Sequence, residues 1–256
     1  GTELLARVWK AEIRGVTGHT VPVFFLDTFH PENSERHLNL GLTLYGGDDW
    51  VRIRQEYLLG VGGVRLLEQM GYDVDGLHLN EGHCTFALLE MLGKGWSREE
   101  LAKRVLFTTH TPVPAGHDRF QWGDVEEVLG ELMPKDAKQL VIDAGDPENG
   151  ERISMSHLAV ALSGPVNAVS NLNAWVASSM FADHHIAPIT NGVHHITWTS
   201  PAMSELFDTH LEGWKEDPTK LAHAGRIPTE DLAESRDKAR KVLRDLVKVG
   251  TGVDLE

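Results

Sequence analysis

Short apolar segments of strand length alternate with longer helical patterns through the middle of this chain. The apolar segments are residues 76–80, 104–109, 165–170 and 187–190, and the helical patterns between them are residues 81–92, 155–162 and 172–181. Parallel strands must be joined by long crossover connections, which are usually helices, so this alternation predicts a parallel sheet with helices packed on it. The predicted fold class is therefore α/β of the doubly wound type.

The rest of the chain also carries local patterns. Residues 6–13 and 21–26 are rich in apolar and β-branched residues on either side of a turn, which predicts a hairpin-like pair of strands. Residues 49–70 have helical spacing, and Gly71 is placed to end that helix. Its glycines at 60, 62 and 63 weaken a helix, so we expect them to mark close packing against a sheet. Further helices are predicted at 125–133, 203–211 and 229–247, and loops at 28–44 and 135–151.

Composition and charge exclude several classes of partner. The formal net charge of −14 opposes binding to nucleic acid or to an anionic membrane, because both require a basic surface. No apolar run reaches the length that spans a bilayer. The single cysteine, Cys84, cannot form an intramolecular disulfide, and we expect a cytoplasmic protein. The 256 residues suffice for one large domain or one domain with an appendage, and the start at Gly1 leads us to expect a segment of a longer protein.

Polar side chains gather where two strands of the predicted sheet end. The two clusters are Asn80, Glu81 and His83 after the strand at 76–80, and Thr109, His110 and Thr111 after the strand at 104–109. The carboxyl ends of parallel strands form the crevice in which ligands bind, so these clusters predict a site for a hydroxyl-rich ligand.

Each cluster also has an explanation that involves no ligand. His110 is followed by an extended loop with two prolines, and its side chain could equally satisfy loop backbone groups. Asn80 is a favourable N-cap, and Glu81 in a first helical turn is favoured by the helix dipole, so capping accounts for much of that cluster. The dipole disfavours a cationic His83, and a neutral one could contact either a neighbouring loop or a ligand. Position alone leaves both interpretations open.

Other chemistries are poorly represented. Asn191 and Gly192 follow the strand at 187–190. This pair indicates a tight turn, and a part in a ligand site is the less favoured interpretation. The histidines lack the spacing of zinc ligands, so no metal is predicted. The glycines at 60, 62 and 63 lie inside a helical pattern, and neither a phosphate-binding loop nor a nucleophile elbow occurs.

Several motifs together resemble the retaining α-glucan phosphorylase family (glycogen, starch and maltodextrin phosphorylases), in its shorter bacterial and archaeal branch. They are Leu26-Asp27-Thr28 with Pro31-Glu32-Asn33-Ser34, Leu44-Tyr45-Gly46-Gly47-Asp48, the stretch at 53–63, His78-Leu79-Asn80-Glu81-Gly82-His83, the stretch at 107–118 around Thr109-His110-Thr111-Pro112, and Thr190-Asn191-Gly192-Val193-His194. The resemblance runs from about residue 8 to about residue 247 and is specific only in combination.

The resemblance implies a glycosyltransferase of the GT-B type with two Rossmann-like domains, of which this chain is most of the N-terminal one. Residues 1–200 would form its α/β core and residues 201–256 a helical C-terminal segment, with the C-terminal cofactor domain absent. The implied reaction transfers the terminal α-1,4-linked glucose of a glucan or maltodextrin to inorganic phosphate, which gives α-glucose 1-phosphate. The implied cofactor is pyridoxal phosphate, whose Schiff-base lysine belongs to the other domain. We therefore expect no cofactor on this chain and no activity from it alone.

The same resemblance implies roles for individual residues. His110 matches the histidine that contacts the glucose, with its backbone carbonyl placed to stabilise an oxocarbenium-like centre, and is the predicted catalytic residue. Glu81 and His83 match residues that shape the pocket. The full predicted substrate-binding set is Asn80, Glu81, His83, Thr109, Thr111 and Asn191.

The sequence departs from the family in one segment. Ala168 stands where the family usually has glycine, and Asn173-Ala174-Trp175 replaces the usual His-Gly-Glu. This departure motivates an alternative, a non-catalytic glucan-binding or regulatory domain on the same scaffold. A glycogen-synthase-like transferase, which shares the two-domain architecture, fits the motifs less well. A homo-oligomer is compatible with the sequence.

Overall fold

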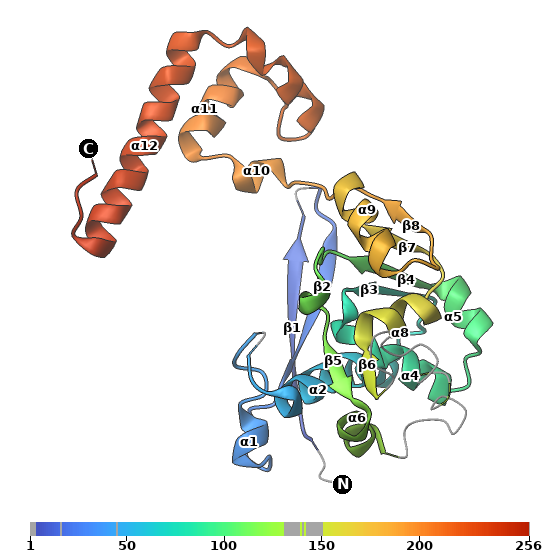
Figure 1. Cartoon of the computed structure of the whole chain (residues 1–256). Helices are drawn as coiled ribbons and strands as arrows, with labels where there is room; N and C mark the ends of the chain where they lie inside the picture. Colours follow the sequence, from blue (N-terminus) through green and yellow to red (C-terminus); the bar gives the residue numbers. More distant parts are fainter. Residues whose placement is uncertain are drawn as a thin grey trace. The chain divides into compact units, whose positions relative to one another are not determined.

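The computed structural model describes residues 4–15, 17–44, 46–130, 139, 141 and 151–255, in two compact units (Figure 1). The first unit, Gly1–Thr190, holds the strands and most of the helices. The second unit, Asn191–Glu256, is helical.

The centre of the first unit is a parallel sheet of four strands. Its order is β3 (Leu77–Asn80), β4 (Val105–Thr109), β7 (Val166–Ala168) and β8 (Ile186–Pro188). Leu77 lies opposite Val105, Phe107 opposite Val166, and Val166 opposite Ile186. The predicted parallel sheet with flanking helices is confirmed, and each of its strands falls within two residues of a predicted segment.

The hydrophobic core lies around this sheet. Val105, Phe107 and Val166 are at most 5% exposed, and Phe86 and Leu88 of α4 (Phe86–Gly93) are fully buried. Each such side chain contributes about 1.5–3 kcal/mol when it leaves water. Helix α8 (Met155–Leu162) packs against β4, and α9 (Asn171–Met180) packs against β7 and β8. Polar residues gather at the edge of the sheet where the parallel strands β3, β4 and β7 end.

The helix predicted at 49–70 is present as three consecutive pieces, α2 (Asp49–Tyr57), the π-helical turn η1 (Leu58–Gly62) and α3 (Gly63–Gln69). Asp48 caps its start by accepting from the backbone N–H of Val51 at 3.0 Å, and Gly71 follows its end with φ +77°. Close packing at Gly60 is confirmed, because an added Cβ would lie 2.6 Å from the backbone nitrogen of Ala87. The partner of Gly60 is the start of α4 and not a sheet, and at Gly63 an added Cβ would meet nothing within 4 Å, so the expectation was wrong for those two positions. At Gly62 an added Cβ would lie 3.5 Å from Leu26, which belongs to a strand.

Smaller elements complete the first unit. The predicted hairpin is confirmed as the antiparallel pair β1 (Arg7–Arg14) and β2 (Thr20–Asp27). A single helical turn, α1 (Glu35–Leu38), interrupts the predicted loop at 28–44. The helix predicted at 125–133 is α6 (Trp122–Leu129), and the part of that prediction beyond residue 130 lies outside the described residues. So does most of the loop predicted at 135–151.

Some elements were not predicted. The antiparallel pair β5 (Arg119–Gln121) and β6 (Arg152–Ser154) has only three residues in each strand. Helix α5 (Arg98–Arg104) buries Leu101 alone and is set by a capping box between Ser97 and Glu100. Neither the three-residue strands nor the short helix α5 has enough apolar positions to show a period in the sequence.

The second unit consists of α10 (His195–Trp198), α11 (Pro201–His210), the 3₁₀ segment η5 (Pro218–Arg226) and α12 (Thr229–Thr251). The helices predicted at 203–211 and 229–247 are confirmed as α11 and α12. A small core of its own surrounds Trp214, which is 1% exposed. Among the described residues, no helix combines the length and apolar character needed to cross a membrane.

Candidate active site

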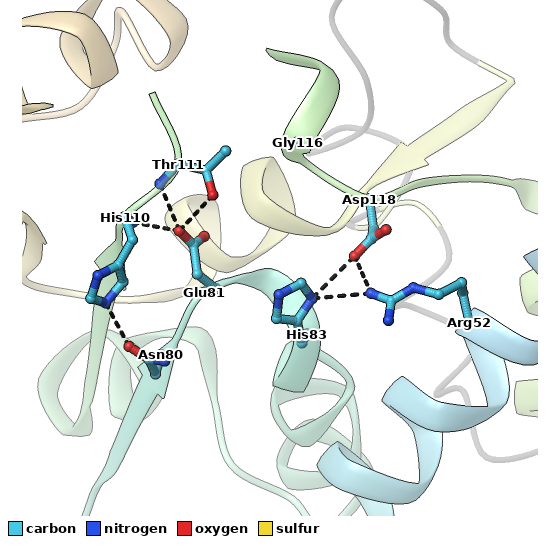
Figure 2. A pocket seen from close by; sticks show the side chains of 8 residues that line it. All are labelled: Arg52, Asn80, Glu81, His83, His110, Thr111, Gly116 and Asp118. Carbon is cyan, nitrogen blue, oxygen red and sulfur yellow. Dashed lines mark hydrogen bonds and ion pairs between the residues drawn. The ribbon is translucent and has the colours of Figure 1, made fainter. Parts of the chain in front are cut away.

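A polar cavity of about 570 Å³ lies where β3 and β4 end (Figure 2). Its walls come from α2, from the turn after β3 that includes the 3₁₀ turn η2 (Gly82–Cys84), and from the loop after β4 that includes the 3₁₀ turn η3 (Pro114–Gly116). The lining residues are Arg52, Asn80, Glu81, His83, His110, Thr111, Gly116 and Asp118.

The structure brings most of the predicted site residues together at this cavity. The five that line it are Asn80, Glu81, His83, His110 and Thr111. Thr109 is fully buried at the end of β4, and its hydroxyl has no hydrogen-bond partner among the described residues. Asn191 is the first residue of the second unit, and its part in a site stays a prediction.

Glu81 ties the turn after β3 to the loop after β4. Its carboxylate accepts hydrogen bonds from the backbone N–H of His110, from the backbone N–H of Thr111 at 2.7 Å and from the Thr111 hydroxyl at 2.9 Å. In Figure 2 this carboxylate faces both His110 and Thr111. Glu81 itself has φ +66°, so it stands in a turn and not in the first turn of a helix. The expectation that the dipole of a helix starting at residue 81 explains Glu81 was therefore wrong.

Asn80 holds the imidazole of His110. The His110 Nε2 lies 2.6 Å from the Asn80 Oδ1, which fits an Nε2–H donor and leaves Nδ1 as an acceptor. The proposed N-cap role of Asn80 was wrong, because the helix α4 begins only at Phe86 and its preceding residue makes no side-chain cap. Asn80 and Glu81 thus fix the ring and the backbone of His110 from the neighbouring strand.

Charged side chains form a second cluster on the opposite wall of the cavity, at α2. The Arg52 Nη2 donates to the Asp118 Oδ2 at 2.6 Å and to the Glu56 Oε1 at 3.2 Å. The His83 Nδ1 lies 3.1 Å from the same Asp118 oxygen. Asp118 therefore joins a guanidinium and an imidazole that come from different elements (Figure 2).

The environment of this cluster changes the protonation of its members. Hydrogen bonds to Asp118 and then to Glu56 raise the pKa of His83 to about 9. Burial raises the pKa of Glu56 to about 8. Burial alone would also raise the pKa of Asp118, but hydrogen bonds from His83, Glu56 and Arg52 lower it below its usual range. Both shifts favour the protonated forms of His83 and Glu56 at neutral pH, while Asp118 stays a carboxylate.

Whether His83 is protonated determines the nature of its close contact with Arg52. The Arg52 Nη2 also lies 3.3 Å from the His83 Nδ1, which would be a hydrogen bond only if that nitrogen were an acceptor. A protonated Nδ1 donates to Asp118 instead. The contact is then an approach of two cations on either side of a shared carboxylate.

A metal ion is a poor occupant of this cluster. Donor atoms of Glu56, His83 and Asp118 lie within 4.8 Å of one another, which could suit a divalent cation. The Arg52 guanidinium already contacts two of those groups, at 2.6 and 3.2 Å, and a metal would have to displace it. Cys84 is also no nucleophile in this chain, because burial raises the pKa of its thiol to about 11.

Sequence reasoning missed three lining residues, Arg52, Gly116 and Asp118. One signal was available in the sequence: Arg52 and Glu56 are spaced i, i+4 beside the apolar Ile53, which places a charged pair next to the apolar face of a predicted helix. Charged groups near a buried face need polar partners, because burying them without partners is costly. The identity of that partner, Asp118, is a contact across 66 residues of sequence and has no local signature.

Several curated relatives of this chain are maltodextrin or glycogen phosphorylases. The chain is 34% identical over 251 residues to the maltodextrin phosphorylase of Thermococcus litoralis, covering 89% of this chain and 30% of that protein. It is 31% identical over 234 residues to the glycogen phosphorylase of Mycobacterium tuberculosis, covering 79% and 26%. It is 31% identical over 263 residues to the glycogen phosphorylase of Aquifex aeolicus, covering 94% and 37%.

No family model matches the chain. The chain spans between 26% and 37% of the length of these curated relatives, although they match most of the chain itself. Over most of its length, this chain is thus a relative of a segment of the maltodextrin and glycogen phosphorylases.

Proposed function

We propose that this chain is most of the N-terminal Rossmann-like domain of an α-glucan phosphorylase of the GT-B type. Residues 1–200 would supply the α/β core, residues 201–256 a helical segment, and the C-terminal cofactor domain would lie outside this chain. The observation that carries the proposal is the fixed position of His110, whose ring and backbone are held by Asn80 and Glu81 at the cavity wall. The similarity to phosphorylases over 89% of the chain supports it.

The proposed reaction breaks the bond between C1 of the terminal α-1,4-linked glucose and the glycosidic oxygen. An oxygen of inorganic phosphate forms the new bond to C1, and the glycosidic oxygen leaves with the proton that the phosphate gives up, which yields α-glucose 1-phosphate and a shortened glucan. Positive charge develops at C1 in the transition state. A preorganised backbone carbonyl at His110 would stabilise that charge, because a fixed dipole needs no reorganisation during the reaction.

The cavity also has the chemistry to hold a sugar. The His110 Nδ1 can accept a hydrogen bond, the Asn80 amide can donate one, and the Thr111 hydroxyl lies at the same wall. Fixed donors and acceptors of this kind recognise hydroxyl groups and set the orientation of a ring.

Pyridoxal phosphate, which the proposed function requires, does not fit the residues of this cavity. Its covalent anchor is a lysine amine, and none of the eight lining residues is a lysine. We propose that the rest of the protein holds the cofactor. This chain alone is then expected to be inactive. A cytoplasmic protein without nucleic-acid or membrane partners remains the accompanying expectation, as does a possible homo-oligomer.

The test is phosphate-dependent release of glucose 1-phosphate from maltoheptaose by the complete protein, with and without added pyridoxal phosphate. We expect cofactor-dependent release, and a loss of about 100-fold in a His110→Ala variant, because it removes the ring that Asn80 holds at the cavity wall and that would orient the glucose. The matched control is His223→Ala, which removes an exposed histidine outside the cavity. No release from folded, cofactor-loaded protein would reject the proposal.

One observation supports a second candidate function, that of a non-catalytic glucan-binding domain. The segment around Asn173 departs from the phosphorylase pattern. Calorimetric binding of maltoheptaose by a complete protein that releases no glucose 1-phosphate would support this candidate, and absence of binding would exclude it.

A further inference from the structure

The side chain of Asn173 makes two hydrogen bonds from a buried position at the start of α9. It is 7% exposed, and its own backbone N–H is capped by the Ser170 hydroxyl at 3.0 Å. Its side-chain Oδ1 accepts from the backbone N–H of Val169 at 3.2 Å. Its Nδ2 donates to the backbone carbonyl oxygen of His110, also at 3.2 Å. Both arms of the amide are therefore engaged, which defines its orientation.

With this contact, every polar group of His110 except one ring nitrogen has a partner. Glu81 binds the backbone N–H, Asn80 binds the ring and Asn173 binds the carbonyl. Asn80 is the last residue of β3 and Glu81 follows it, whereas Asn173 comes from α9, the helix that follows β7. Side chains from the end of β3 and from α9 thus hold His110, a residue that lines the cavity.

We infer that Asn173 is a positioning residue that sets the direction of the His110 carbonyl, an inference that rests on the proposed phosphorylase function. A carbonyl oxygen has two lone pairs, so a hydrogen bond from Asn173 to one of them leaves the other for a ligand. Rotation of the His110 peptide would break this bond. The dipole is therefore held before substrate arrives, which is the condition under which it lowers a barrier.

The inference also explains the departure at this position. The resemblance places a histidine where this chain has Asn173. Histidine and asparagine can each present one N–H donor and one acceptor. The neighbouring replacement, Trp175, is 75% exposed and does not share this buried position. The donor function can thus be retained although the residue type has changed.

The experiment uses the complete protein with three substitutions. Asn173→Asp keeps an oxygen to accept from Val169 but removes the donor to His110. Asn173→His restores a donor. Asn171→Asp is the matched control, because it adds the same charge to the same helical turn at an exposed residue. Urea unfolding midpoints that agree between the two aspartate variants establish that both fold equally well.

Two readouts are taken. We expect Asn173→Asp to lower kcat for phosphorolysis by about 10- to 100-fold with KM within about 3-fold, because the lost interaction matters in the transition state. Asn171→Asp should behave as the unsubstituted protein, and Asn173→His should recover most of kcat. The carbonyl ¹³C chemical shift of His110 should move in Asn173→Asp and stay in place in Asn171→Asp.

The outcomes separate this inference from the proposed function. If the unsubstituted protein is active and Asn173→Asp keeps its kcat, the inference is overturned and the proposed function stands. A rise in KM alone also overturns it, since that indicates uniform binding. If the unsubstituted protein releases no glucose 1-phosphate, the proposed function fails, and with it the inference. An unmoved carbonyl shift overturns the inference in every case.

Discussion

The carboxylate of Glu81 accepts hydrogen bonds from both the backbone N–H and the hydroxyl of Thr111, at 2.7 and 2.9 Å. These bonds join the ends of two neighbouring parallel strands, across 30 residues of sequence. To make them, Glu81 adopts φ +66°, and it is the one residue other than glycine with a positive φ among those the structure describes. A backbone conformation of this kind costs about 1–3 kcal/mol and persists where surrounding contacts offset it.

Backbone strain at Glu81 predicts a difference between two variants that both lose the carboxylate. Glu81→Ala retains the strain, whereas Glu81→Gly relieves about 1–3 kcal/mol of it and costs about 0.4–1 kcal/mol through a more flexible unfolded chain. We expect both variants to be less stable than the unsubstituted chain, with the glycine variant more stable than the alanine variant by about 1 kcal/mol. Urea unfolding of the 256-residue chain measures this. An alanine variant at least as stable as the glycine variant would contradict the strain.

Substitution by alanine at two glycines of the same long helix should change the free energy of unfolding in opposite directions. A Cβ at Gly60 would lie 2.6 Å from the backbone nitrogen of Ala87, and backbone cannot yield as a flexible side chain can. We expect Gly60→Ala to cost about 1–3 kcal/mol. Gly63 has ordinary helical φ of −61° and no atom within 4 Å of the added Cβ, so Gly63→Ala should stabilise by about 0.5–1 kcal/mol. Equal unfolding midpoints for the two variants would show that Gly60 is not in close contact.

Local patterns were sufficient for the sheet and the long helices. The strands β4 and β7 bury side chains on both faces, as strands covered by helices on both sides do, and the apolar residues at their starts mark them in the sequence. The same logic failed for α5, in which Leu101 is the one buried residue. A short polar helix held by a capping box has too few apolar positions to show a period.

The site was predicted only in part, because its contacts are long-range. The strand ends indicated that Asn80 and His110 would meet, since parallel strands end at the same edge. Capping rules gave the wrong role for Asn80 and Glu81, because the donors of a loop 29 and 30 residues away compete for those side chains. Arg52 lies on a helix outside that edge, and no local sequence pattern predicts its contact with Asp118.

Stability should fall as pH rises through the range in which His83 loses its proton. The pKa of His83 is raised from 6.5 to about 9, and that of Glu56 is raised from 4.5 to about 8. A raised pKa means that the folded state binds the proton more tightly, so the stabilisation is complete below the unfolded pKa and is lost as pH passes the folded pKa. We expect the free energy of unfolding to decrease from about pH 4.5, where Glu56 begins to contribute, to about pH 9, and most steeply between pH 6.5 and 8, where both groups contribute.

The measurement is urea unfolding at several pH values across that window. A His83→Gln variant should show a shallower decrease, because it lacks one of the two groups that release a proton. Asp118 does not oppose the trend there, since its lowered pKa affects stability only at acid pH. Identical pH dependence in the variant would mean that His83 is not protonated in the folded chain.

The carboxylate of Asp118 should be the main reason that His83 is a cation at neutral pH. Its Oδ2 lies 3.1 Å from the His83 Nδ1, and the Glu56 oxygen is more distant at 3.7 Å. Asp118→Asn keeps the shape of the side chain and removes its charge. We expect the pKa of His83 to fall from about 9 toward its ordinary value of 6.5, because the nearby Arg52 guanidinium then opposes a second cation. Titration of the imidazole resonances by NMR follows this change directly.

The matched control for that titration is Asp124→Asn, which removes an exposed carboxylate on α6 that does not line the cavity. It makes the same change of net charge, so any effect of overall charge appears in both variants. A fall in the His83 pKa in Asp118→Asn alone would assign the shift to the contact. Equal titration curves in the two variants would instead assign it to the buried Glu56, and would leave Asp118 as a partner of Arg52 only.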